Sequence, residues 1–456
     1  MPTEAHNRLR NITGLQNFST ALLGPFGANL YKGDPNNFAP RVGFAYSPLK
    51  QTVVRGAFGV FFDASTQLAG ELFFNPGITA ENVIFGPGLA PGEPAAYPIN
   101  PALLQTTVSP NPPYTTSTVI DPNLRNAYTE SYTFNVQQGF GASTVIQLGY
   151  VGNVGRDLYR ERVLNLLLNG STAAPNPNFP TGGINFLDNS ADSSYNSLQA
   201  SLTERMGRRL QGTIAYTWAH SIDNVSTNGG YGSVNSNVYP TDPLNLALDR
   251  GNSDFDVTQN LSAGFAYELP FERLTAISRA VSSGWKIDGL VSIHSAFPYT
   301  ALLGSSTVND GDPNLASGER PDPIPGQPLY VSSGGFSHIA NVAAFQCPGG
   351  GAIAAGCPVN GVFGSVGRNT LRGFPFRQFD FNVEKDFPIH ESLGLEFRIE
   401  FFNLFNTPNF ANPANALTSA QFGEPATMAD YNSTGIGQFF NSGGPRSIQL
   451  ALRLHF

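Results

Sequence analysis

Charged side chains alternate with apolar ones in two short runs of this chain. Glu396, Arg398 and Glu400 occupy every second position of one run, and Glu384 lies at the end of the other. Carboxylates held close together can act as a general acid and a general base. On an alternating strand, however, any hydrated face supplies carboxylates at this spacing. We therefore interpret these residues as the wet face of a sheet and not as a catalytic pair.

A second group of charges comprises Asp249, Arg250, Asp254 and Asp256. It lies where a long polar segment meets the next alternating segment. Two roles are open: the charges could hold the base of a loop by ion pairing, or they could contact a ligand. We favour the structural role, because long loops that carry function need a rigid support.

The remaining candidates for catalysis and metal binding are weak. None of the six histidines lies in a hydrolase or metal motif, and neither Gly-x-Ser-x-Gly nor a phosphate-binding Gly-rich loop occurs. The acidic segment 309–314 lacks the spacing of a calcium loop and is interpreted as an Asx/Gly turn. We expect no enzymatic activity, no cofactor and no metal.

Cys347 and Cys357 are the only cysteines and lie in one Gly/Ala/Pro-rich stretch. In an oxidising compartment they could form a local disulfide. The alternative is a pair of free thiols in a loop. A metal site is not expected, because no further ligands lie nearby in the sequence.

The composition favours all-β structure with long polar loops. Of the 456 residues only 13% are charged, 12% are aromatic, and the chain contains 49 Gly and 35 Pro. The formal net charge of −8 argues against a nucleic-acid partner, since no basic stripe is present to neutralise phosphates. No apolar run reaches the roughly 20 residues of a membrane helix. The first residues lack the apolar region of a secretory signal peptide.

The main structural signal is a period of two, which is typical of strands with one apolar and one polar face. Such strands must meet water on one side and an apolar medium on the other. The pattern predicts eleven strands, at residues 40–47, 52–62, 127–138, 144–152, 195–204, 210–220, 257–269, 285–295, 376–387, 393–405 and 447–456.

The links between these strands alternate in length. Short links join the first strand to the second, the third to the fourth, the fifth to the sixth and the ninth to the tenth, with a moderate link between the seventh and eighth. The intervening links are long, at 63–126, 153–194, 221–256, 296–375 and 406–446. Short periplasmic turns and long extracellular loops are typical of an antiparallel transmembrane β-barrel, which is the predicted fold class.

Eleven strands are an odd number, whereas bacterial single-chain barrels have even numbers. The first and last strands would lie parallel if they met, so the antiparallel sheet could not close. We expect residues 1–38 to end an extracellular loop and residues 39–456 to form the C-terminal part of a larger barrel. This expectation also accounts for the missing signal peptide.

The amino-acid sequences of several segments resemble those of the TonB-dependent outer-membrane receptors, in particular of their Oar-like group. The segments that carry the likeness are 37–46, 54–63, 249–256, 398–410 and the closing strand. The resemblance implies a 22-stranded barrel with an N-terminal plug, of which this chain would be the C-terminal half. It implies ligand capture by external loops and uptake across the outer membrane of a bacterium. The amino-acid sequences of the loops do not indicate which substrate is bound.

The resemblance also implies partners. Leu450, Leu452, Leu454 and Phe456 are similar to the C-terminal signal that the barrel assembly machinery reads. The outer-membrane lipid would surround the barrel, and contact with the TonB complex would be made only through an N-terminal region not seen in this chain. The alternatives are an outer-membrane adhesion or structural barrel without transport, and a soluble secreted β-protein.

Overall fold

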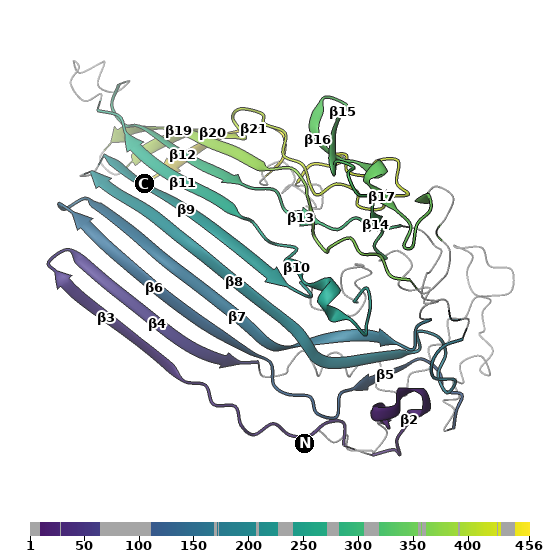
Figure 1. Ribbon diagram of the computed structural model, residues 1–456. Helices are drawn as coiled ribbons and strands as arrows, with labels where there is room; N and C mark the ends of the chain where they lie inside the picture. Colours follow the sequence, from purple (N-terminus) through teal and green to yellow (C-terminus); the bar gives the residue numbers. More distant parts are fainter. Residues whose placement is uncertain are drawn as a thin grey trace, which may run out of the picture.

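The protein is described by a computed structural model, shown in Figure 1. It describes residues 10–456 except 28, 64–110, 168–170, 172, 207–208, 227–239, 271–281, 305–318, 354–356, 358–361, 391–392, 426 and 430–442. The fold is dominated by one large antiparallel sheet, with smaller sheets gathered at one of its ends.

All eleven predicted strands are present, with ends that differ from the predicted ones by a few residues except in β7 and β8. Their bounds are β3 Arg41–Leu49, β4 Thr52–Phe62, β6 Tyr128–Phe140, β7 Thr144–Leu164, β8 Ile184–Met206, β9 Leu210–Asp223, β11 Gln259–Glu268, β12 Trp285–His294, β19 Phe376–His390, β20 Leu393–Phe402 and β21 Ser447–His455. Each pairs antiparallel with its predecessor and its successor among these eleven.

The sheet is open in this structure. Its order runs from β3 at one edge to β21 at the other, and these two edge strands do not pair with each other. The eleven strands alternate in direction, so the two edge strands run the same way. An antiparallel closure therefore needs an odd number of further strands between them. The short turns gather at the left of Figure 1 and the long links at the right.

The cross-strand register separates the side chains into an apolar and a polar face. On the apolar face Phe397 lies between Leu452 of β21 and Lys385 of β19, whereas on the polar face Arg398 lies between Ala451 and Glu384. Large apolar side chains remain exposed along the apolar face, including Val42, Phe44 and Tyr46 of β3 and Ile448, Leu450, Leu452 and Leu454 of β21. An exposed apolar face of this extent indicates contact with a membrane or a partner.

Two charged side chains, Glu204 and Lys385, lie on the apolar face near the short-turn end. The Thr144 hydroxyl donates a hydrogen bond to Glu204 at 2.5 Å. Lys385 is buried, donates to the backbone oxygens of Ser283 and Asp386, and lies over the ring of Phe387 at 4.6 Å. A charged head that turns toward a membrane interface in this way keeps its hydrogen bonds.

Strands β7 and β8 extend well beyond their predicted ends, to 21 and 23 residues. The register between them shifts between Gly155 and Leu158 and again before Arg160, and Asp157 has a positive φ of 51°. Bulges of this kind break the alternation of a strand without ending it. The period-two pattern therefore stopped at the bulge, while the hairpin continues into the long-link end.

The long links carry cores of their own. Ile12, Leu23, Ile184 and Phe186 belong to one buried cluster, which joins the N-terminal segment to the β7–β8 hairpin. The small elements here are β1 Ile12–Thr13, η1 Leu15–Thr20, β2 Leu22–Leu23, β5 Ser117–Ile120, η3 Leu246–Asp249 and β10 Gly251–Asn252. Residues 10–27 thus pack among the long links, and the domain boundary at residue 38 stays a prediction.

A second core surrounds the two cysteines. Its buried residues include Tyr299, Leu303, Ala344, Phe345 and Leu371. The elements around it are β13 Pro298–Tyr299, β14 Asp322–Pro323, β15 Tyr330–Ser333, β16 Phe336–Ala340, η4 Val342–Ala344, β17 Phe345–Gln346 and β18 Leu371–Arg372. We call the described part of residues 319–373 the disulfide lobe.

Within the described part of the chain, no helix has the length and apolar character needed to cross a membrane.

The register predicts different costs for a charge on the two faces. Phe397→Arg should lower the free energy of unfolding in phospholipid vesicles by about 2–4 kcal/mol, because the guanidinium enters hydrocarbon. Gln449→Arg is the matched control, since Gln449 lies on the polar face opposite Glu400. Urea titration of both variants measures the difference, and equal losses would contradict this assignment of the faces.

Candidate functional site

The charged group around Asp249 is buried at the base of the long links. Arg160 of β7 donates to one Asp249 oxygen at 2.6 Å, and Arg320 of the disulfide lobe donates to the other at 2.9 Å. Arg320 also donates to the Thr241 hydroxyl at 2.6 Å and to the Leu248 carbonyl oxygen at 3.0 Å. One carboxylate therefore joins three segments that are far apart in the sequence.

Arg368 forms the second half of this arrangement. It pairs with the buried Asp223 at the end of β9, lies 3.4 Å from an oxygen of Asp254, and donates to the Asp249 carbonyl oxygen at 2.8 Å. Its side chain is only 4% exposed. We call the connected residues the rim anchor, which consists of Arg160, Asp223, Asp249, Asp254, Arg320 and Arg368.

Asp256 makes a separate contact. It pairs with Arg372 of the lobe, accepts from the Ser221 backbone N–H at 2.7 Å, and lies 3.3 Å from His220 Nδ1. Arg250, in contrast, is exposed and forms no ion pair with any residue that the structure describes. The structure thus brings three of the four predicted rim residues into ion pairs, and Arg250 stays outside them.

The electrostatics of the rim anchor favour an anchoring role. Burial lowers the pKa of the Arg320 guanidinium, Asp249 opposes this shift, and the neighbouring Arg368 and Arg160 add to it. Arginine keeps its charge even so, because its ordinary pKa is above 12. Three buried guanidiniums and their carboxylates form a network whose members cannot be removed singly without leaving a buried charge.

The arginines of the rim anchor could not be found from the sequence. Arg160 lies in the predicted long link 153–194, and Arg320 and Arg368 lie in a link of 80 residues that carries no motif. The pairing becomes visible only when distant links pack together.

The disulfide lobe contributes Arg320 and Arg368 to the rim anchor. Cys347 and Cys357 are joined in the structure by a disulfide with an S–S distance of 2.09 Å. Asp322 accepts hydrogen bonds from the Gly349 N–H at 2.9 Å and from the Ser365 N–H and hydroxyl at 2.8 and 2.7 Å. Burial raises the pKa of Asp322, but these hydrogen bonds outweigh it and leave that pKa below its usual 3.8. The carboxylate ties two turns of the lobe together.

A cavity of about 460 Å³ lies beside the rim anchor, among the long links. Phe18 and Phe186 contribute aromatic surface, and Arg162 and Asp121 contribute charge. The further lining residues are Leu15, Leu164, Asn165, Leu166, Pro175, Pro243 and Leu244. A mostly apolar cavity with a few polar groups has the usual character of a small-ligand site.

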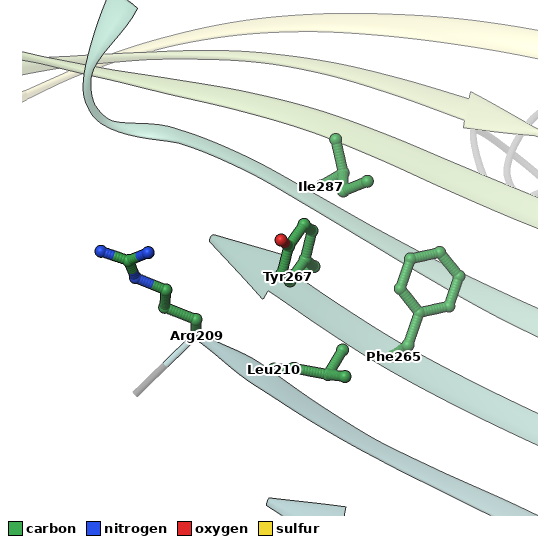
Figure 2. A pocket seen from close by; sticks show the side chains of 5 residues that line it. All are labelled: Arg209, Leu210, Phe265, Tyr267 and Ile287. Carbon is green, nitrogen blue, oxygen red and sulfur yellow. The ribbon is translucent and has the colours of Figure 1, made fainter. Parts of the chain in front are cut away.

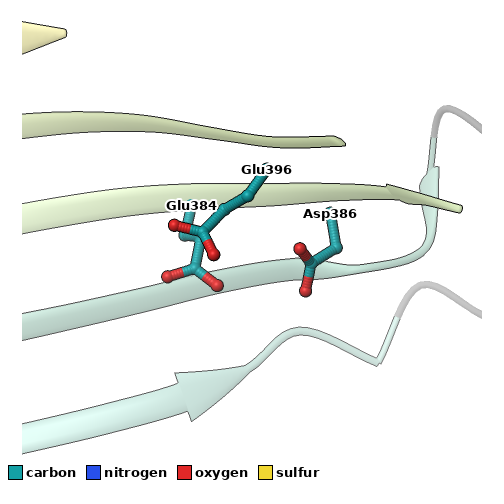
Figure 3. Close-up of side chains that lie close together, drawn as sticks. All are labelled: Glu384, Asp386 and Glu396. Carbon is teal, nitrogen blue, oxygen red and sulfur yellow. The ribbon is translucent and has the colours of Figure 1, made fainter. Parts of the chain in front are cut away.

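Three carboxylates of the wet face lie close together near the short-turn end (Figure 3). Glu384, Asp386 and Glu396 bring oxygens within 4.8 Å of one another, a spacing that a metal ion could use. Lys286 Nζ, however, lies 2.9 Å from Glu384 and 3.0 Å from Asp386, and Arg398 lies 2.8 Å from Glu396. Two cationic side chains are thus shared among these three carboxylates, and together they form an ion-pair network. Glu400 extends it, at 3.6 Å from Arg398.

Two further predicted features concern the last strand and a loop. Leu450, Leu452 and Leu454 lie on the apolar face of β21, and Phe456 follows it with 91% of its surface exposed. Their part in barrel assembly stays a prediction. The acidic segment 309–314 falls outside the described residues.

Comparison with known families decides the class of the protein. The family model described as "Outer membrane beta barrel domain" matches residues 1–449. The chain belongs to this family. The protein lies in the bacterial outer membrane. The apolar face of the large sheet is the lipid-facing surface of the barrel domain, and the polar face of the sheet lines the lumen. The long links are therefore extracellular and the short turns periplasmic.

Solved structures with a similar arrangement are outer-membrane receptors and transporters at low identity. The outer membrane transporter YddB from Escherichia coli is 11% identical, with a TM-score of 0.46 over 89% of this chain and 39% of that one. The ferric enterobactin receptor PfeA from Pseudomonas aeruginosa is 11% identical, with a TM-score of 0.41 over 92% and 40%. The FrpB iron transporter from Neisseria meningitidis is 9% identical, with a TM-score of 0.40 over 91% and 39%.

The chain spans about two fifths of the length of these solved structures. A comparison with curated protein sequences gives no match.

The rim anchor predicts a large effect of one substitution. Asp249→Asn removes the charge that Arg160 and Arg320 share, which should destabilise the packed links by about 3–5 kcal/mol. Hydrogen exchange of the β7–β8 hairpin and of the disulfide lobe measures the loss. Arg250→Ala is the matched control and should leave exchange unchanged; an equal effect of both variants would mean that the pairing does not hold the links.

The lowered pKa of Asp322 predicts that the disulfide lobe loses stability in acid. Because its native pKa is lowered, its contribution to stability is present above the ordinary carboxyl pKa and is lost as pH falls through the native value. Pepsin cleavage of the lobe should therefore accelerate as pH falls from about 5 to about 2 in the wild type. Asp322→Asn should weaken the lobe at neutral pH and flatten this dependence, whereas Glu424→Gln, at an exposed acid, should behave like the wild type.

Proposed function

We propose that the chain is the barrel portion of a TonB-dependent receptor/transporter of the Oar-like type. Its extracellular links would capture a ligand, which would then cross the outer membrane through the lumen. Coupling to the TonB complex and a plug that gates the lumen belong to this proposal, and both rest on the family that the sequence resembles.

The observation that carries the proposal is the packed state of the extracellular links. The ion pairs of the rim anchor join these links to one another, and the links enclose a cavity of about 460 Å³. Binding sites of this kind need loops positioned by a rigid scaffold.

An adhesion barrel without transport remains the second candidate. It would use the same extracellular surface, but no cavity and no charged lumen would be needed. Uptake measurements separate the two. Cells that express the protein are supplied with a labelled ferric siderophore, a labelled oligosaccharide or a labelled peptide, with the TonB complex intact or deleted. Accumulation that is lost with the TonB complex supports transport; surface attachment without accumulation of any probe supports adhesion.

A substitution that narrows the mouth of the cavity should weaken ligand binding. Leu244 is 69% exposed at the cavity, so Leu244→Trp adds bulk without disturbing a core. For the probe that the wild type accumulates, we expect the apparent Kd to rise about tenfold, which corresponds to about 1.4 kcal/mol. Leu329→Trp, on the disulfide lobe away from the cavity lining, is the control. Unchanged binding in the Leu244 variant would mean that capture occurs elsewhere.

A further inference from the structure

A hollow in the lipid-facing surface lies near the periplasmic end of the sheet. Its volume is about 680 Å³, and it is lined by Arg209, Leu210, Phe265, Tyr267 and Ile287 (Figure 2). Tyr267 of β11 lies opposite Leu210 of β9 on one side and Ile287 of β12 on the other. The register therefore places the apolar lining on the face that meets hydrocarbon.

Two glycines explain why the surface is hollow here. Phe265 has Gly212 and Gly289 as its cross-strand partners. A Cβ at Gly289 would meet the Phe265 ring at 2.7 Å, whereas the nearest atoms to a Cβ at Gly212 would be the Gly264 carbonyl oxygen at 3.3 Å and Phe265 Cβ at 3.6 Å, and none of the three nearest atoms belongs to the ring. The ring thus leans over Gly289 and leaves the surface above Gly212 uncovered. Side chains of the usual size at either position would have filled the groove.

One end of the groove is polar. Arg209 is exposed in the short link between β8 and β9, and its guanidinium lies at the same end as the Tyr267 hydroxyl (Figure 2). The planar guanidinium matches the geometry of a phosphate, to which it can donate two parallel hydrogen bonds. Tyrosine hydroxyls commonly lie at this level, where the bilayer meets water.

The order of apolar and polar surfaces along the groove matches one class of molecule. An apolar channel in the hydrocarbon region leads to a cation and a hydroxyl donor at the periplasmic interface. A glycerophospholipid has the complementary order, with acyl chains that end in a glycerol phosphate. Its charge complements Arg209, and an open groove can take a flexible chain along its length.

We propose that this groove is a binding site for one glycerophospholipid of the periplasmic leaflet. An acyl chain lies over Gly212 between Leu210 and Phe265, and the phosphate accepts hydrogen bonds from Arg209 and Tyr267. The site does not depend on transport, because a barrel that only adheres would present the same groove. Its test is therefore independent of the uptake experiments.

Native mass spectrometry of the full chain in non-ionic detergent tests the site. Dioleoylphosphatidylglycerol is the probe, and dioleoylglycerol, which lacks the phosphate, is the comparison. We expect one bound phospholipid and about tenfold weaker binding of the diacylglycerol, the size expected for losing a charge-assisted hydrogen bond. Arg209→Ala should show a similar loss for the phospholipid, and Tyr267→Phe a smaller one.

Two further variants separate the groove from general charge. Leu210→Trp keeps the polar end and fills the apolar channel, so it should weaken the probe without altering the charge. Lys50→Ala removes a cation from the short link between β3 and β4, away from the groove, and should bind like the wild type. All these side chains lie on the surface, and far-UV circular dichroism checks that each variant keeps its β-structure.

The outcomes that overturn the proposal are distinct. Equal binding of phospholipid and diacylglycerol would show that no phosphate is recognised. Equal losses in the Lys50 and Arg209 variants would show a diffuse charge effect. If the wild type retains no phospholipid but copurifies with a protein that Leu210→Trp releases, the groove is a protein interface. Should Arg209→Ala not fold, Arg209→Gln removes the positive charge but keeps a polar side chain of similar length. Wild-type binding of the phospholipid by Arg209→Gln would equally refute phosphate recognition.

Discussion

The constraint on which the structure depends is the absence of water in the hydrocarbon layer. There, each backbone N–H and C=O group must be satisfied inside the protein, and a continuous sheet is one of the two ways to do so. The unbroken antiparallel order from β3 to β21 follows from this requirement. The same requirement sorts the side chains, because a charge tolerated on the lumen side is costly on the lipid side.

The constraint ends where the strands leave the membrane. Beyond Gly155 the β7–β8 hairpin bulges, loses its alternation and begins to bury side chains on both faces. Water is available here, so the long links fold as a soluble protein does, around apolar clusters. Charges can be buried as well, provided that they are paired, as Asp249 is with Arg160 and Arg320.

The two faces of the sheet consequently have different functions. The lumen face concentrates charge on its last strands, where Lys286 and Arg398 form ion pairs with a cluster of carboxylates. The lipid face contains a hollow near Arg209, where Phe265 has two glycines as its cross-strand partners. The ligand capture that we propose would be a function of the anchored links and of neither face.

The sequence by itself determined the eleven strands, the direction of each, the membrane class and the parallel open edges. These features depend on a period of two and on link lengths, both of which are local properties of the chain. It could also single out Asp249, Asp254 and Asp256. It could not supply their partners Arg160, Arg320, Arg368 and Arg372, the cavity beside them, or the groove at Gly212. Those depend on which distant links and neighbouring strands come together, and only the packing of the folded chain decides that.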